Sequence, residues 1–128
     1  MAKTILIVDD DPDYLAQMQM QLEAAGYRVV PADGLAAAKK ALENQKPDLA
    51  LVDLMLEEAD GGFALCYHIK KIDQAIPVLL VTAVASETGL DFDAATDEER
   101  SWVKADGLLA KPVRFEQLQR EIKRLLKE

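Results

Sequence analysis

The chain has 128 residues, of which 50% are hydrophobic and 30% are charged, a balance typical of one globular domain and not of a disordered segment. A formal net charge of −8 argues against direct contact with nucleic acid, because neutralising phosphates needs a basic face. No apolar run approaches the roughly 18 residues of a membrane span, and no signal-peptide pattern opens the chain. We expect a cytoplasmic protein whose single cysteine, Cys66, is a packing residue in a reducing compartment.

Five short apolar runs alternate with longer segments of helical spacing. The expected strands are Thr4–Val8, Tyr27–Val30, Leu49–Val52, Val78–Val81 and Gly107–Ala110. The expected helices carry the apolar stripe Leu15, Met18, Leu22 and Ala25, closed by Gly26, then Leu35–Leu42, Phe63–Ile72, and the stripe Phe115, Leu118, Ile122 and Leu125. Strands without polar alternation are typical of a parallel sheet covered on both faces. The pattern predicts an α/β fold, a doubly wound (βα)5 flavodoxin-like three-layer sandwich with a central parallel five-stranded sheet.

One connection is long and acidic. It covers about residues 84–104, and Thr96 with Glu99 has the spacing of a capping box, which predicts a short helix over Asp97–Lys104. Connections of this length within a compact domain are often functional. We expect residues 1–128 to form one domain that contains this extended connection.

The residues that directly follow the expected strands are chemically unusual. They are Asp9, Asp10 and Asp11 after the first strand, Asp53 after the third, Thr82 after the fourth and Lys111 after the fifth. Ligands of open parallel sheets bind beyond the carboxyl ends of the strands, so these side chains are expected to meet at one edge. Asp11 precedes Pro12, and this pair also suits a helix N-terminus.

Carboxylates that converge at one edge repel each other unless a cation joins them. Oxygen ligands at this density suit Mg²⁺, and an ionised Asp53 could then attack a phosphoryl group. Lys111 and the Thr82 hydroxyl could contact two of the phosphoryl oxygens, with the metal at the third. The pattern therefore predicts phosphoryl transfer to an aspartate.

Five motifs in this order resemble the receiver domain of response regulators, the phospho-accepting module of two-component signalling. They are Ile5–Asp11, Leu51–Met55, Asp60-Gly61, Val81–Ala83 and Lys111-Pro112. The resemblance implies that Asp53 is the phospho-acceptor, that Asp10 binds Mg²⁺ directly and Asp9 through water, and that the Met55 carbonyl completes the protein ligands. It also implies that Thr82, Lys111 and the Ala83 amide contact the phosphoryl group.

The resemblance implies a signalling protein that catalyses its own phosphorylation and dephosphorylation and is not a conventional enzyme. Its phosphoryl donor would be a histidine kinase or a phosphotransfer protein. Its output would be a change in binding to a separate protein target, with no direct role for nucleic acid or membrane. We expect a stand-alone monomer or a weak homodimer.

Two positions depart from the family's usual pattern. Glu57 stands where a proline is frequent, and Leu108 stands where an aromatic switch residue is usual. These departures leave open an alternative function, that of a pseudo-receiver that binds proteins without cycling phosphate.

A phosphatase of the haloacid-dehalogenase type also places aspartates after its first strand, but it needs acidic ligands beyond its lysine, and no aspartate follows Asp106. A flavodoxin-like electron carrier is disfavoured by the acidic loop Asp9–Asp13, where a flavin phosphate needs amides and hydroxyls.

Overall fold

The computed structural model describes residues 3–53, 61–82, 106–110 and 113–127, with the backbone alone described at 61–63, 82, 108 and 110. The elements are β1 (Thr4–Val8), α1 (Pro12–Ala24), β2 (Arg28–Ala32), α2 (Leu35–Asn44), β3 (Leu49–Asp53), α3 (Gly61–Ile72), β4 (Val78–Thr82), β5 (Gly107–Ala110) and α6 (Phe115–Leu126). The strands form one sheet in the order β2-β1-β3-β4-β5, and every neighbouring pair is parallel.

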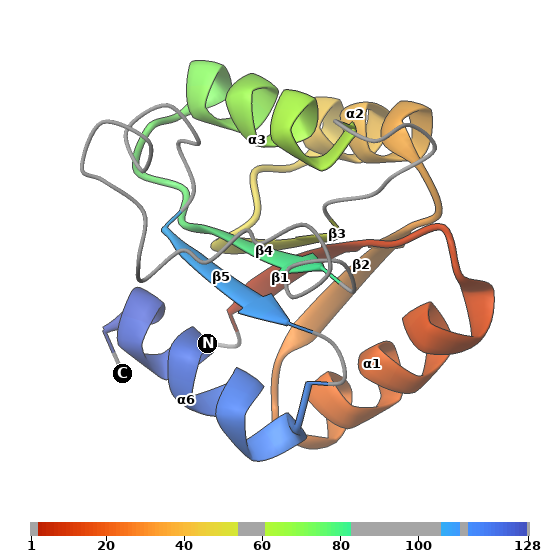
Figure 1. The fold of residues 1–128 in the computed structure, drawn as a ribbon. Coiled ribbons are helices and arrows are strands. Elements are labelled where there is room, and N and C mark those ends of the chain that lie inside the picture. Colours follow the sequence, from red (N-terminus) through yellow and green to blue (C-terminus); the bar gives the residue numbers. More distant parts are fainter. Residues whose placement is uncertain (1–2, 54–60, 83–105, 111–112, 128) are drawn as a thin grey trace.

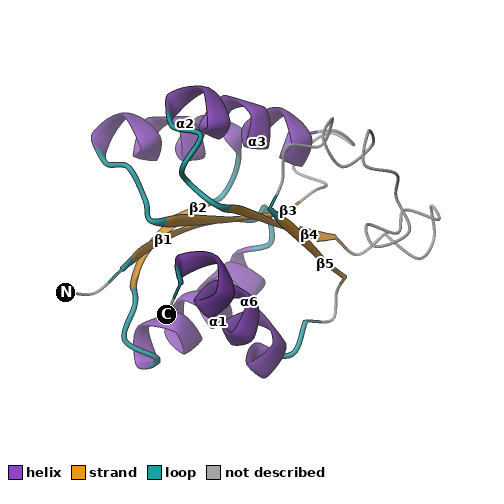
Figure 2. Ribbon diagram, turned by 90° about the vertical axis from the view of Figure 1, so that its left-hand side faces the viewer, coloured by secondary structure: helices purple, strands orange, loops and turns teal. Residues whose placement is uncertain are grey.

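Helices cover both faces of the sheet, as the sequence predicts. Figure 2 shows α2 and α3 on one side of the strands and α1 and α6 on the other. In Figure 1 the chain runs from the inner strand β1 out to β2 and then across the sheet to β5. The expected helix Asp97–Lys104 lies outside the described residues.

Alternate residues of each strand enter two separate cores. Leu6 and Val8 of β1 pack beneath α2 and α3 with Val52 of β3, whereas Ile5 and Ile7 pack beneath α1 and α6. All five residues of β1 and all five of β3 are buried. Burial on both faces explains why these strands are apolar at successive positions instead of alternating.

The two ends of α1 follow the signals read from the sequence. Asp11 is the N-cap residue, and its side chain accepts hydrogen bonds from the amides of Asp13 and Tyr14. Gly26 follows the helix with φ of +100°, a backbone conformation that favours glycine at a helix end. Ala25, which the apolar stripe placed on the buried face, is exposed because the helix has already ended at Ala24.

The second strand extends further than the sequence indicates. It runs over Arg28–Ala32 and includes Pro31, although the apolar pattern alone ends the strand at Val30. Proline lacks the amide hydrogen that a central strand needs, but β2 is an edge strand that pairs only with β1. Among the described residues, no helix is long and apolar enough to cross a membrane.

Candidate functional site

Strand register brings the polar strand-end residues to one edge of the sheet. Val8 of β1 is paired with Val52 of β3, so the next residues along the chain, Asp9 and Asp53, lie side by side. Asp53 is in turn paired with Val81 of β4. The edge is therefore assembled by backbone pairing between strands that are far apart in sequence.

Asp9 and Asp53 are both buried. Asp9 is 2% exposed and Asp53 is 7% exposed. The Asp9 amide donates to the Ala32 carbonyl at 3.1 Å, which continues the β1–β2 pairing by one residue. The Asp11 amide donates to Asp9 Oδ1 at 2.9 Å, so both the backbone and the side chain of Asp9 are held.

Asp10 joins these two residues and is exposed. Carboxylate oxygens of Asp9, Asp10 and Asp53 all lie within 4.8 Å of one another. Three negative charges at this separation, two of them shielded from solvent, repel each other. The donor set consists of oxygen atoms alone and suits a hard divalent cation such as Mg²⁺, so the residues present fit the metal that the sequence indicates.

Tyr14 lies near this cluster and is affected by its charge. Burial and, to a smaller extent, the charges of Asp9 and Asp53 together raise the pKa of its phenol from 10.0 to about 12. Tyr14 is not among the site residues predicted from the sequence. The available signal was its place beside Leu15 in the first turn of the helix that begins after the acidic loop.

The remaining predicted site residues are described in part or not at all. Thr82 is the last residue of β4 and is paired with Ala110 of β5, but its side chain is not described. Leu108 lies within β5, also without a described side chain. Residues outside the described part of the chain are Met55, Glu57, Ala83, Lys111 and Pro112. Their predicted roles therefore remain predictions.

Comparison with known proteins identifies relatives over nearly the whole chain. Residues 5–123 match the family described as the response regulator receiver domain. The alkaline phosphatase synthesis transcriptional regulatory protein PhoP of Bacillus subtilis is 35% identical over 128 residues, which cover 99% of this chain and 50% of PhoP. The chain thus spans about half the length of this curated relative.

Solved structures give the same relationship. A CheY-like receiver domain protein from Methanospirillum hungatei has a TM-score of 0.81 at 29% identity, covering 99% of this chain and 95% of that one. The response regulator TrrA of Thermotoga maritima, solved in complex with Mg²⁺ and beryllium fluoride, has a TM-score of 0.77 at 26% identity, covering 96% and 98%. The chain belongs to the family of response regulator receiver domains of two-component systems.

Proposed function

We propose that this receiver accepts a phosphoryl group on Asp53 from a phosphohistidine donor and that Mg²⁺ is required. The observation that carries the proposal is the burial of the Asp53 carboxylate within 4.8 Å of ligand oxygens from Asp9 and Asp10. A carboxylate at the end of a buried strand is held in a fixed place, which favours its use as a nucleophile.

In the transfer step, a carboxylate oxygen of Asp53 attacks phosphorus as the phosphorus–nitrogen bond of the donor breaks. The electron pair of that bond goes to the imidazole nitrogen, which takes up a proton. In the separate dephosphorylation step, water attacks the same phosphorus, and the bond to Asp53 breaks. Inorganic phosphate and a proton are released, and the carboxylate is restored.

Bound Mg²⁺ would supply positive charge to the phosphoryl oxygens during this transfer. We propose that Asp10 binds the ion directly, that Asp9 holds one of its water ligands, and that the Met55 carbonyl completes the protein's contribution. Asp9 is suited to the indirect role because one of its oxygens already accepts the Asp11 amide. Thr82, Lys111 and the Ala83 amide would contact the phosphoryl group itself.

The partners follow from this chemistry. We propose a histidine kinase or a phosphotransfer protein as donor, a downstream protein whose binding changes on phosphorylation, and a cytoplasmic location. Residues 1–128 would act as one domain, with the connection of about residues 84–104 enlarged. PhoP is named as a transcriptional regulator, and this chain covers 50% of it. The expectation that nucleic acid is not contacted directly therefore applies only to these 128 residues, whose net charge is −8.

The test is to incubate the protein with acetyl phosphate and Mg²⁺ and to weigh it intact by mass spectrometry. We expect one added phosphoryl group, absent when Mg²⁺ is chelated and absent in the Asp53→Asn variant. Asp33→Asn is the matched control, because Asp33 directly follows β2, is exposed and lies outside the cluster. This variant should be phosphorylated like the unaltered protein. If no adduct forms and beryllium fluoride does not bind, the proposal is wrong and a pseudo-receiver role is favoured.

A further inference from the structure

A second polar cluster lies where β4 and β5 begin, at the opposite end of the sheet from the acidic edge formed by Asp9, Asp10 and Asp53. Asp106 directly precedes β5, and its amide donates to the Val78 carbonyl at 2.8 Å. The Val78 amide donates back to Asp106 Oδ2 at 2.7 Å. Asp106 therefore makes a reciprocal pair of hydrogen bonds with the first residue of β4.

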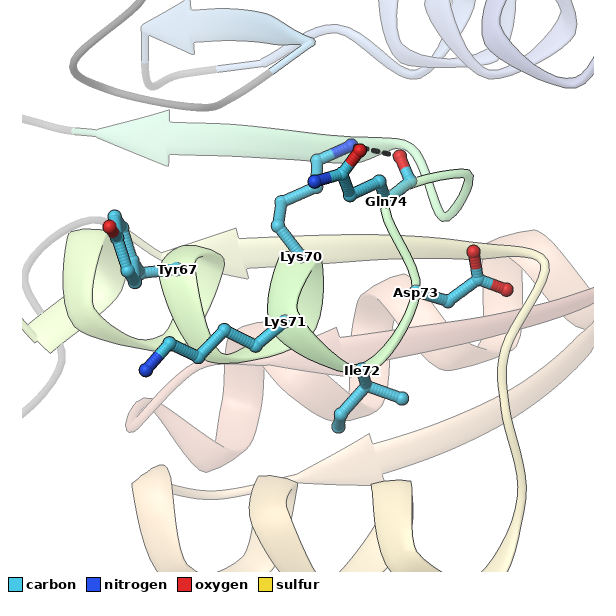
Figure 3. Close-up of a pocket in the computed structure, with 6 residues that line it drawn as sticks. All are labelled: Tyr67, Lys70, Lys71, Ile72, Asp73 and Gln74. Carbon is cyan, nitrogen blue, oxygen red and sulfur yellow. Dashed lines mark hydrogen bonds between the residues drawn. The ribbon is translucent and has the colours of Figure 1, made fainter.

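Lys70 of α3 completes this cluster. Its ammonium group donates to Asp106 Oδ2 at 2.8 Å, to the Ile76 carbonyl at 2.7 Å and to the Gln74 carbonyl at 3.3 Å. Figure 3 shows the Lys70 side chain reaching the Gln74 carbonyl, while Lys71 extends away from it. The Lys70 side chain is only 16% exposed. One partly buried cation thus ties the end of α3, the loop before β4 and the start of β5.

This cluster selects a single register for β5. A carboxylate at position 106 is needed to bind both the Val78 amide and Lys70, and neither neighbour, Ala105 or Gly107, has one. Gly107 adds a steric requirement, because a Cβ atom there would lie 2.8 Å from Leu79 Cδ1. A shift of one residue would place a side chain against Leu79 and would turn every β5 side chain to the opposite face.

The register of β5 matters for the chemistry at the other end of the strand. β5 has four residues, Gly107–Ala110, and Lys111 follows it directly in the chain. We propose that Lys70 is a positioning residue, which holds Asp106, fixes the register of β5 and thereby governs the rate at which Asp53 is phosphorylated. This proposal rests on the proposed phosphorylation of Asp53.

The experiment compares Lys70→Met with Lys71→Met, which makes the same change at the next residue of the same helix. We measure the rate of phosphorylation by acetyl phosphate and, separately, Mg²⁺ affinity by calorimetry. Lys70→Met should slow phosphorylation by about tenfold, because small displacements of a reacting group are costly in rate. Mg²⁺ affinity should be unchanged, because the side chains proposed to hold the ion, Asp9, Asp10 and Asp53, lie directly after β1 and at the end of β3. Lys71→Met should behave like the unaltered protein, and Lys70→Arg, which keeps a charged donor, should recover most of the rate.

Cys66 provides a readout that does not depend on activity. It is the single cysteine of the chain and is fully buried; burial raises the pKa of its thiol to about 11, while Lys70 lowers this pKa and Asp106 raises it. Because removing Lys70 raises the thiol pKa, faster alkylation in Lys70→Met reports exposure of the thiol and not its ionisation. Loss of a hydrogen bond to a charged group should raise its alkylation by iodoacetamide about tenfold in Lys70→Met. Asp106→Asn, which keeps an acceptor for the Val78 amide, should also show slower phosphorylation and faster alkylation of Cys66, but both changes should be smaller.

Three results would overturn the positioning role, and they differ from one another. Faster alkylation of Cys66 with unchanged phosphorylation would show that Lys70 only stabilises the fold. An unchanged rate in both assays would show that Lys70 does not hold β5. Absence of an adduct on the unaltered protein would refute the proposed function itself, and the positioning role with it.

Discussion

Replacing Asp9 with asparagine removes one charge from the acidic cluster while keeping its shape. The amide oxygen can still accept the Asp11 amide hydrogen bond, which is 2.9 Å long in the structure. Two unit charges no more than 4.8 Å apart repel by at least about 3.5 kcal/mol at an effective dielectric constant of about 20. The replacement therefore relieves repulsion without opening a cavity and keeps the acceptor for the Asp11 amide.

We expect Asp9→Asn to raise the free energy of unfolding of the metal-free protein by about 1–2 kcal/mol, less than the full repulsion because exposed Asp10 keeps one side of the cluster in contact with solvent. The midpoint of thermal unfolding should rise by about 3–5 °C for each kcal/mol in a chain of this length. The same variant should bind Mg²⁺ more weakly. Its advantage in stability over the unaltered protein should therefore shrink or reverse as Mg²⁺ is added. For the unaltered protein, Mg²⁺ at about 100 times its Kd adds about 2.7 kcal/mol.

Urea unfolding with and without Mg²⁺ measures both effects, and Asp33→Asn is the control because it removes an exposed charge outside the cluster. The control should change stability by less than about 0.5 kcal/mol in either condition. A metal-free Asp9→Asn variant that is no more stable than the unaltered protein would refute the idea that these carboxylates repel. An unchanged gain on adding Mg²⁺ would refute the assignment of Asp9 to the metal site.

Three further predictions concern stability. Asp11→Ala removes the N-cap of α1 and should cost about 1 kcal/mol in urea unfolding, whereas Asp13→Ala, which leaves that cap in place, should cost less; equal losses would contradict the capping role. Gly107→Ala should cost about 1–3 kcal/mol, because the new Cβ would meet the buried Leu79 at 2.8 Å, and a neutral result would show that Leu79 can move aside. Because the pKa of Tyr14 is raised from 10.0 to about 12 in the fold, the stability that its protonated phenol contributes is complete below pH 10 and is lost as the pH rises toward 12. The free energy of unfolding of Tyr14→Phe should therefore fall less steeply with pH over that range than that of the unaltered protein. Identical slopes of unfolding free energy against pH would contradict the raised pKa.

Local sequence patterns were sufficient to predict the layers of the fold and the acidic edge. Apolar runs without alternation identify β1 and β3 because both faces of these strands are buried. Strand-end residues could be grouped because parallel strands all present their carboxyl ends at the same edge. Asp11 and Pro12 marked the start of α1 because capping depends on neighbouring residues alone.

Features that depend on distant residues could not be read in the same way. Pro31 ends an apolar pattern, and only the position of β2 at the sheet edge explains why the strand continues through it. Lys70 and Asp106 are 36 residues apart, and nothing local in either segment predicts their contact. Tyr14 was missed for a related reason, because its distance from Asp53 is set by the packing of α1 on the sheet.

The most direct measurement is to locate the phosphoryl group after treating the unaltered protein with phosphoramidate, a donor that, like phosphohistidine, carries phosphorus bound to nitrogen. Borohydride reduction of the acyl phosphate, followed by peptide mass spectrometry, identifies the modified residue. A modification at Asp53 that requires Mg²⁺ is the predicted result. Modification of Asp9, Asp10 or any other residue in place of Asp53, or no modification, would contradict Asp53 as the phospho-acceptor.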